Sequence, residues 1–284
     1  MRNNSSKSQA AAIQGGRGSF HHIAAGCFAE SGAGKEVLPC ADFKTVVSIA
    51  AERSDATGIM AIENSLAGSL LHNYTLLDRH PVSVTGEVYL RIHQNLLTLP
   101  GKKAEDLREV HSHPMALAQC DEFLSRYRHI RLVETEDTAM SAEELARKGK
   151  ADRGAIASKL AAELFGLEIA AEGIENNPEN YTRFLLIRQR LTDPEPARKA
   201  SLSLELPHAR GTLYALLGAA ADAGFNLTKI QSMPVIGSPG RYRFYLDVEH
   251  ETPFTAAPLE AALTPHAEDL QIHGIYTPGK RFDA

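Results

Sequence analysis

A proline-rich, charged segment at residues 192–200 divides the chain into two parts with different sequence patterns. The segment reads TDPEPARKA and holds two prolines and four charged side chains, a composition typical of a linker. Short apolar runs alternate with helical patterns before it, whereas the part after it favours elements in the order βαββαβ. We therefore expect one domain at 11–191, a linker at 192–199 and a second domain at 200–280.

The alternation of strands and helices in the first domain predicts an α/β fold with a mostly parallel sheet covered on both faces. A stretch of this length favours two small lobes over one large sheet, and a ligand would lie in the cleft between them. Two strand-like pieces are expected around Gly86, within residues 82–99. The order βαββαβ in the second domain predicts an α+β ferredoxin-like fold, which we interpret as a regulatory or dimerising module.

The composition argues against several classes of partner. An apolar share of 43% and a charged share of 23% are typical of a globular protein. A net charge of −5 provides no electrostatic footprint for nucleic acid or for an anionic membrane. Residues 1–10 are polar and lack the apolar core of a secretory signal, so we expect a disordered tail and a cytoplasmic location. The three cysteines and twelve histidines show no metal-ligand spacing, so no metal site is expected.

A glycine-rich turn follows the first predicted strand. Residues 15–20 read GGRGSF and lead into a helical pattern that starts at Ser19. A strand, a glycine turn and a helix in this order point backbone N–H groups at an anion. The alternative is a tight turn in which Ser19 only caps the helix. We interpret the adjacent pair His21 and His22 as a surface feature, because neighbours on a helix point in different directions.

Two polar segments mark candidate binding positions. An apolar strand at 58–62 ends abruptly in ENSLAGS, residues 63–69, and open α/β sheets bind ligands at the carboxyl ends of their strands. The alternative is a helix start capped by Asn64 or Ser65.

The second segment, NPENYTRFLLIRQ at 177–189, reads as a turn followed by a strand. Thr182 and Arg183 stand where the polar loop meets that strand, and the guanidinium fork of Arg183 suits a carboxylate. The alternative is a plain turn and core strand with Arg183 in solvent.

Together these segments resemble prephenate dehydratase with a C-terminal ACT domain, over residues 11–280. The matches are GGRGSFH at 15–21, ENSLAGS at 63–69, SHPMALAQC at 112–120 with Met115 replacing the usual Gln, GAIAS at 154–158, and the Asn-x-Thr-Arg-Phe-Leu signature at 180–185. Each motif alone is weak, but matches in the same order and spacing are strong because independent chance matches multiply. The resemblance implies a type 2 periplasmic-binding-protein-like catalytic domain with the substrate between two lobes.

The resemblance also implies a reaction, in which prephenate becomes phenylpyruvate, water and carbon dioxide without a metal or an organic cofactor. It assigns the donor to the leaving hydroxyl to Thr182, and a carboxylate contact to Arg183, which could instead hold the loop. Glu63 is expected to be structural, because its carboxylate would repel a dianionic substrate. The positions expected to orient the substrate or support the site are Asn64, Ser112 and Gln119. The positions expected to border the substrate are Ser19, Ser65, Gly68 and Phe184, of which the last packs mainly in the core.

In the family, L-phenylalanine binds between the ACT domains of two chains and inhibits the enzyme, which implies a homodimer or homotetramer. Gln231 replaces the usual Glu of the effector site, and Met233 replaces the usual Arg. A predicted helix start near residue 211 provides N–H groups that suit a carboxylate. The corresponding effector positions are Gly211, Thr212, Leu213, Asn226, Leu227, Gln231 and Ser232.

Two other functions are compatible with the sequence. The substrate could be arogenate, which carries an amino group where prephenate has a keto group. A non-catalytic amino-acid sensor could also be built from a binding cleft and an ACT domain. The set Thr182, Asn64, Ser112 and Gln119 favours the enzyme, because a sensor has no use for all four.

Overall fold

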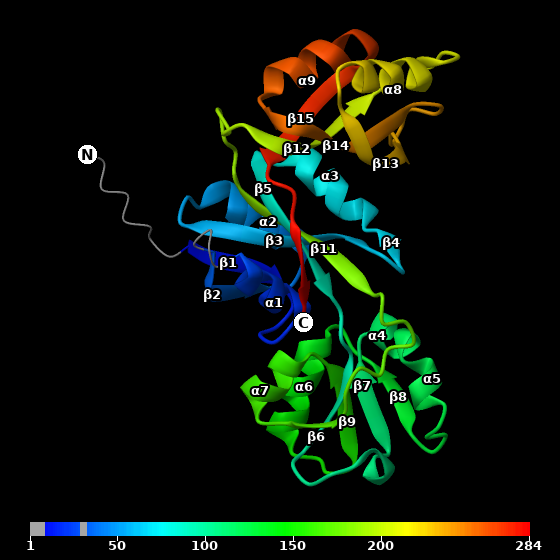
Figure 1. Ribbon diagram of the computed structural model, residues 1–284. Coiled ribbons are helices and arrows are strands. Elements are labelled where there is room, and N and C mark those ends of the chain that lie inside the picture. The colour runs from blue at the N-terminus through cyan, green and yellow to red at the C-terminus, as the bar shows by residue number, and fades with distance from the viewer. Residues whose placement is uncertain (1–8, 29–32) are drawn as a thin grey trace, which may run out of the picture.

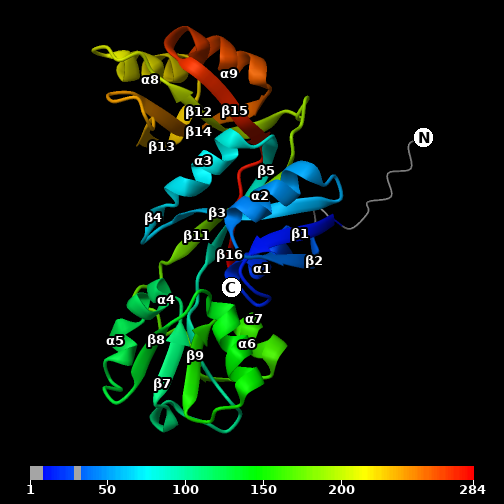
Figure 2. The ribbon, with the colours of Figure 1, turned by 180° about the vertical axis from the view of Figure 1, so that it is seen from behind.

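The computed structural model describes residues 9–28 and 33–284. These residues form three bodies in a row, with the first lobe between the second lobe and the C-terminal domain (Figures 1 and 2). Most of the predicted tail at 1–10 lies outside the described residues, but residues 9 and 10 already belong to the first strand.

The first lobe is built on a sheet with the strand order β16-β5-β11-β3-β1-β2, and β4 pairs with β3. Its strands are β1 (Gln9–Gln14), β2 (Ala33–Cys40), β3 (Ala56–Asn64), β4 (Gly68–Ser69), β5 (Val82–Arg91), β11 (Tyr181–Gln189) and β16 (Lys280–Asp283). Its helices are α1 (Phe20–Cys27), α2 (Phe43–Glu52) and α3 (Leu71–Arg79). The expected parallel pairing holds for β1 with β2 and β3. The expectation of parallel pairing is wrong for β11, which is antiparallel to β3 and β5 because the chain enters β11 where those strands end.

The second lobe has a sheet of order β10-β6-β9-β7-β8. Its strands are β6 (Asn95–Thr98), β7 (Glu109–Ser112), β8 (Arg131–Glu134), β9 (Arg153–Ala157) and β10 (Glu168–Ala171). Its helices are α4 (Pro114–Gln119), α5 (Asp121–Leu124), α6 (Thr138–Lys148), α7 (Lys159–Phe165) and a 3-10 turn at Ala104–Asp106. Because β6 and β10 are antiparallel to their neighbours, this sheet is mixed as well.

The chain passes between the lobes twice, and these two crossings create the hinge. Residues 92–94 lead from β5 into β6, and residues 172–180 lead from β10 back to β11. The two strands expected within residues 82–99 are β5, which runs through Gly86 to Arg91, and β6. The prediction of two lobes is confirmed.

Side-chain caps explain where several helices begin. Asp42, Asp137 and Ser158 each accept a backbone N–H in the first turn of the helix that follows. Ser112 is the last residue of β7, and His113 caps α4.

The C-terminal domain has the expected βαββαβ order and a four-stranded sheet, β13-β14-β12-β15, which is ferredoxin-like topology. Its elements are β12 (Ala197–Glu205), α8 (Thr212–Asp222), β13 (Asn226–Pro234), β14 (Tyr242–Phe254), α9 (Ala256–Leu263), a 3-10 turn at Thr264–His266 and β15 (Glu268–Tyr276). The strand β12 begins inside the predicted linker. The last residues return to the first lobe, where β16 pairs in parallel with β5 as the edge strand of the sheet and Phe282 packs on the core.

One face of the C-terminal sheet packs against α8 and α9, and the other packs against the first lobe. Tyr245 and Tyr276 share a buried cluster with Leu185 and Val84 of the first lobe. At Gly274 the contact is so close that a Cβ would overlap the carbonyl group of Val84. The two domains are therefore packed like parts of one core.

Within residues 9–28 and 33–284, no helix is both long and apolar enough to cross a membrane. The same residues contain no group of three or more His, Cys, Asp or Glu side chains placed to hold a metal ion.

We expect Gly274→Ala to weaken the packing of the C-terminal domain against the first lobe, where Gly274 contacts Val84. The added methyl group has no space, and overpacking of a buried contact costs about 1–3 kcal/mol of unfolding free energy. Urea unfolding followed by circular dichroism measures the loss. The matched control is Gly218→Ala on α8, where a Cβ meets nothing within 4 Å and helix propensity favours alanine by up to about 1 kcal/mol. Equal stability of the two variants would contradict the close packing.

Candidate active site

A cavity of about 330 Å³ lies between the two lobes, beside the hinge. The first lobe contributes the carboxyl end of β3, the start of β11 and the start of α1, and the second lobe contributes α4 and the start of α6. Its lining includes the polar residues Ser19, His21, Asn64, Gln119 and Thr182, and the apolar residues Phe20, Leu70, Ile92, Met115 and Phe184. The carboxylates of Glu136 and Asp137 also line it, so the cleft combines neutral polar, acidic and apolar side chains.

A chain of amide hydrogen bonds crosses the hinge and ends on Thr182. The amide of Asn180 donates to Oε1 of Gln119 over 3.1 Å, and Nδ2 of Asn64 donates to Oδ1 of Asn180 over 2.7 Å. The same Nδ2 donates to Oγ1 of Thr182 over 3.0 Å. Because the Thr182 oxygen accepts this bond, its own proton is available for an acceptor in the cleft, and the accepted bond polarises the hydroxyl as a donor.

The loop that holds Asn64 is itself tied to the second crossing. Oδ1 of Asn64 accepts the N–H groups of Leu66 and Ala67, at 3.0 and 2.9 Å. The hydroxyl of Ser65 donates to the carbonyl group of Glu179 and accepts the N–H of Tyr181. Ser65 therefore acts on the loop and is absent from the described lining of the cavity. Gly68 lies in β4, where its φ of 82° favours glycine.

His21 lies in the cavity wall and not on the surface, so the surface interpretation is wrong. Its ring packs edge-on against Phe184 and tilted against Phe43, with centroids 5.0 and 5.4 Å away. Burial lowers the pKa of His21 to about 4, so the ring is neutral at pH 7 and does not add a positive charge to the cleft.

The glycine turn brings the two lobes into contact. The carboxylate of Asp137 accepts the N–H of Gly16, and Ser158 donates to the carbonyl group of Gly18 over 2.5 Å. A Cβ on Gly18 would lie 2.9 Å from Cα of Ala161, and the φ of Gly18 is 86°. Burial raises the pKa of Asp137, and the backbone N–H groups around it act against that rise. The anion that the turn was expected to receive is thus, at Gly16, a protein carboxylate.

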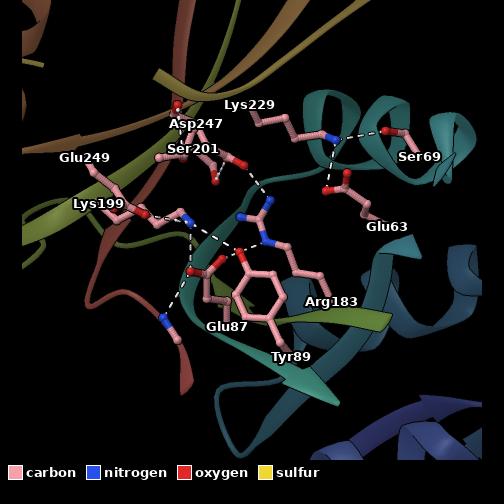
Figure 3. A network of polar contacts seen from close by, with 12 residues as sticks. Glu63, Ser69, Glu87, Tyr89, Arg183, Lys199, Ser201, Lys229, Asp247 and Glu249 are labelled. Carbon is pink, nitrogen blue, oxygen red and sulfur yellow. Dashed lines mark hydrogen bonds and ion pairs between the residues drawn. The ribbon is translucent and has the colours of Figure 1, made fainter. Parts of the chain in front are cut away.

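Arg183 does not reach the cleft, which corrects its assignment as a catalytic residue. Successive residues on a strand face opposite sides. Thr182 lines the cleft, whereas Arg183 points to Asp247 of the C-terminal domain (Figure 3). Nε of Arg183 lies 2.6 Å from Glu87, and its other nitrogens contact Asp247 and, at 3.0 Å, the hydroxyl of Tyr276. Arg183 is only 3% exposed. The guanidinium fork does bind carboxylates, but they belong to the protein.

Ser112 also lies outside the described lining, and this corrects a second expected site residue. It is fully buried at the end of β7, and its hydroxyl donates to the carbonyl group of Ile156 over 2.7 Å. Its role is to join β7 to β9, which places α4 and Gln119 at the cleft.

Sequence reasoning missed Asn180 as a functional position, although it belongs to the signature at 180–185. Asn180 is fully buried and joins Gln119 to Asn64. A buried amide needs hydrogen-bond partners on both its oxygen and its nitrogen, but the sequence does not indicate which residues supply them.

The expected effector positions lie on the C-terminal domain. Gly211 is the N-cap of α8, with a φ of 81°, and Thr212 and Leu213 are the first residues of the helix. Asn226, Leu227, Gln231 and Ser232 lie on β13, an edge strand of its sheet.

The fold and the cleft define a class of protein: a two-lobe α/β binding fold with a polarised hydroxyl at its hinge, joined to a ferredoxin-like domain. A family model described as prephenate dehydratase matches residues 11–192. The chain belongs to the prephenate dehydratase family.

Three known proteins illustrate the similarity. Arogenate dehydratase 1 of Petunia hybrida is 36% identical over 79% of this chain and 58% of its own length, so the chain spans about three fifths of this plant relative. A bifunctional N-acyl-homoserine lactone acylase/prephenate dehydratase of Komagataeibacter europaeus is 33% identical, over 93% of this chain and 94% of its own. The crystal structure of prephenate dehydratase from Arthrobacter aurescens in complex with L-Phe superposes with a TM-score of 0.83 at 26% identity, over 94% of this chain and 90% of that chain.

We expect Arg183→Met to lower the free energy of unfolding by about 3–5 kcal/mol, because it leaves Glu87 and Asp247 as buried charges without their shared partner. Urea unfolding measures this change. Arg53→Met is the control, since Arg53 forms an exposed pair with Asp55 and its loss changes stability little. A similar small effect for both variants would show that Arg183 does not hold the domains together.

Proposed function

We propose that the chain converts prephenate to phenylpyruvate, water and carbon dioxide, a step in the biosynthesis of L-phenylalanine. The single observation that supports this most is the hydroxyl of Thr182, which is placed in the cleft and accepts a bond from Asn64. Membership in the family supports the reaction class.

The reaction requires few groups from the protein. The bond from the ring carbon to the carboxylate breaks and releases carbon dioxide, and its electron pair completes the aromatic ring as the ring hydroxyl leaves. Thr182 donates a hydrogen bond to the departing oxygen, which takes up one proton overall and becomes water. A neutral threonine is a weak acid, so it acts chiefly as a positioned donor in an ordered site. The chain from Gln119 through Asn180 and Asn64 keeps this donor in place.

The cleft offers apolar surface for a ring and one place for a substrate carboxylate. Phe20, Leu70 and Phe184 provide apolar surface for the ring. The described lining contains the acidic residues Glu136 and Asp137 and neither arginine nor lysine. A substrate carboxylate would therefore bind at the start of α1, where Ser19 caps the helix and the first-turn N–H groups carry partial positive charge. Positioning of this kind supplies much of the rate in reactions that need little chemistry from the enzyme.

Arogenate is the alternative substrate, and the name of the petunia relative supports testing it. A side-by-side assay of prephenate and arogenate, with products separated by chromatography, gives the preference. An N-acyl-homoserine lactone is a useful third compound, because the Komagataeibacter relative carries that activity in its name. Absence of turnover with prephenate and arogenate would contradict the proposed function.

We expect Thr182→Ala to lower kcat by about 10²-fold or more, the usual contribution of one positioned proton donor. Thr182→Ser is the matched control, since it keeps the hydroxyl, and it should retain most of the activity. Ultraviolet detection of phenylpyruvate measures both. Near-normal turnover of the alanine variant would remove Thr182 from the mechanism.

The C-terminal domain is proposed to be an ACT domain that binds L-phenylalanine and joins two or more chains. The ferredoxin-like topology and the L-Phe complex of the Arthrobacter relative support this assignment. The expected binding positions lie on β13 and at the start of α8.

We expect millimolar L-phenylalanine to release or absorb heat on binding and to lower turnover. Isothermal titration calorimetry and the phenylpyruvate assay measure these two effects. The carboxylate of the ligand would bind the free N–H groups at the start of α8, so L-phenylalaninamide is the control and should bind more weakly. Folded protein that shows no heat with L-phenylalanine would contradict the effector site.

A further inference from the structure

Four charged side chains meet where the C-terminal domain contacts the first lobe. Lys229 and Asp247 are opposite each other on β13 and β14, and Glu63 and Arg183 are opposite each other on β3 and β11. Lys229 pairs with Glu63 over 3.0 Å, and Asp247 pairs with Arg183. The two pairs therefore face each other with complementary charges, as Figure 3 shows.

Lys229 reaches out of its own domain to the segment 63–69. Besides Glu63, its Nζ donates to the hydroxyl of Ser69 over 2.9 Å, and it lies 5.7 Å from the ring centre of Tyr74. The side chain of Lys229 is 11% exposed, compared with 37% for Glu63. The anion, the hydroxyl and the aromatic face restrict the position of this largely buried ammonium group. Lys229 therefore binds both ends of the segment, at Glu63 and at Ser69.

The neighbouring pair of residues in the first lobe belongs to the active site. Asn64 and Thr182 are opposite each other on β3 and β11, one residue along from Glu63 and Arg183. The pairing shifts by one residue beyond this point, so β3 carries a bulge at Ile62, and such irregularities redirect the side chains beside them. Ile62 packs into the cluster that contains Tyr245 of the C-terminal domain, and Glu63 points to Lys229. The side chain of Asn64 then points to the cleft, where it contacts Thr182.

We propose that Lys229 is a positioning residue for the catalytic hydroxyl, acting through Glu63 and Ser69 on Asn64. The C-terminal domain thereby completes the active site without touching the substrate. Lys229 lies on β13 between Asn226 and Gln231, so a ligand bound at that strand would act on the same contact. The activity readout rests on the proposed function, whereas the structural readout described next does not.

The structural test is hydrogen exchange measured by mass spectrometry on Lys229→Met. The N–H groups of Leu66 and Ala67 are protected by Oδ1 of Asn64, so peptides covering residues 63–70 report on the position of that side chain. We expect these peptides to exchange several-fold faster in Lys229→Met and to be unchanged in Lys148→Met. Lys148 is a suitable control because it forms an exposed ion pair on α6. Unchanged exchange in both variants would overturn the proposal.

The kinetic test compares the same variants with Lys229→Arg. We expect kcat of the folded Lys229→Met enzyme to fall by about 10-fold, below the ~10²-fold that a misplacement of 1 Å can cost, with a smaller change in KM. Lys229→Arg retains the charge and should restore most of kcat. A variant that is merely less stable, with wild-type kcat per folded molecule, would overturn the positioning role.

A double variant tests whether Lys229 acts through Glu63. If both residues act through one contact, Glu63→Gln combined with Lys229→Met should lower kcat no further than Lys229→Met alone. Additive losses would overturn this route. If the wild-type enzyme turns over neither prephenate nor arogenate, the proposed function fails, and hydrogen exchange still decides the positioning role.

Discussion

The arrangement of this molecule depends on the alternation of side chains at the start of β11. Thr182 and Arg183 are adjacent, so the pleat of the strand directs one into the cleft and the other into the C-terminal domain. Arg183 is buried between Glu87 and Asp247. A buried guanidinium is tolerated only when its donors are satisfied, and satisfying them requires the C-terminal domain in its observed place. Through its neighbour Arg183, the position of Thr182 therefore depends on the packing of the C-terminal domain against the first lobe.

The two lobes meet through contacts that keep their relative position well defined. The glycine turn at 15–18 lies close to the starts of α6 and α7, where Asp137 and Ser158 bind its backbone. On the hinge side, Asn180 joins Gln119 of the second lobe to Asn64 of the first. Polar contacts on both sides of the cavity thus determine its width. A site that acts mainly by positioning its substrate depends on such a fixed arrangement of the two lobes.

The C-terminal domain packs closely against the first lobe. Its tyrosines share a core with β5 and β11, and β16, which follows it in the chain, extends the sheet of the first lobe. Lys229 adds an ion pair beside the active-site loop. In the proposed positioning role of Lys229, a change at β13 would act on Asn64 through Glu63 and Ser69, without a large movement of either lobe.

Much of the fold and part of the site could be predicted from the sequence. Local patterns were sufficient for the two domains and the order of most elements, because these depend on neighbouring residues. The motifs also identified Asn64, Gln119 and Thr182, which the structure brings to one cleft. Sequence alone did not show that Arg183 and Ser112 face away from the cleft, that Asp137 binds the glycine turn, or that β16 joins the first sheet. Those facts depend on which surface covers each face of a strand, and partners distant in the chain decide that only when the whole molecule is packed.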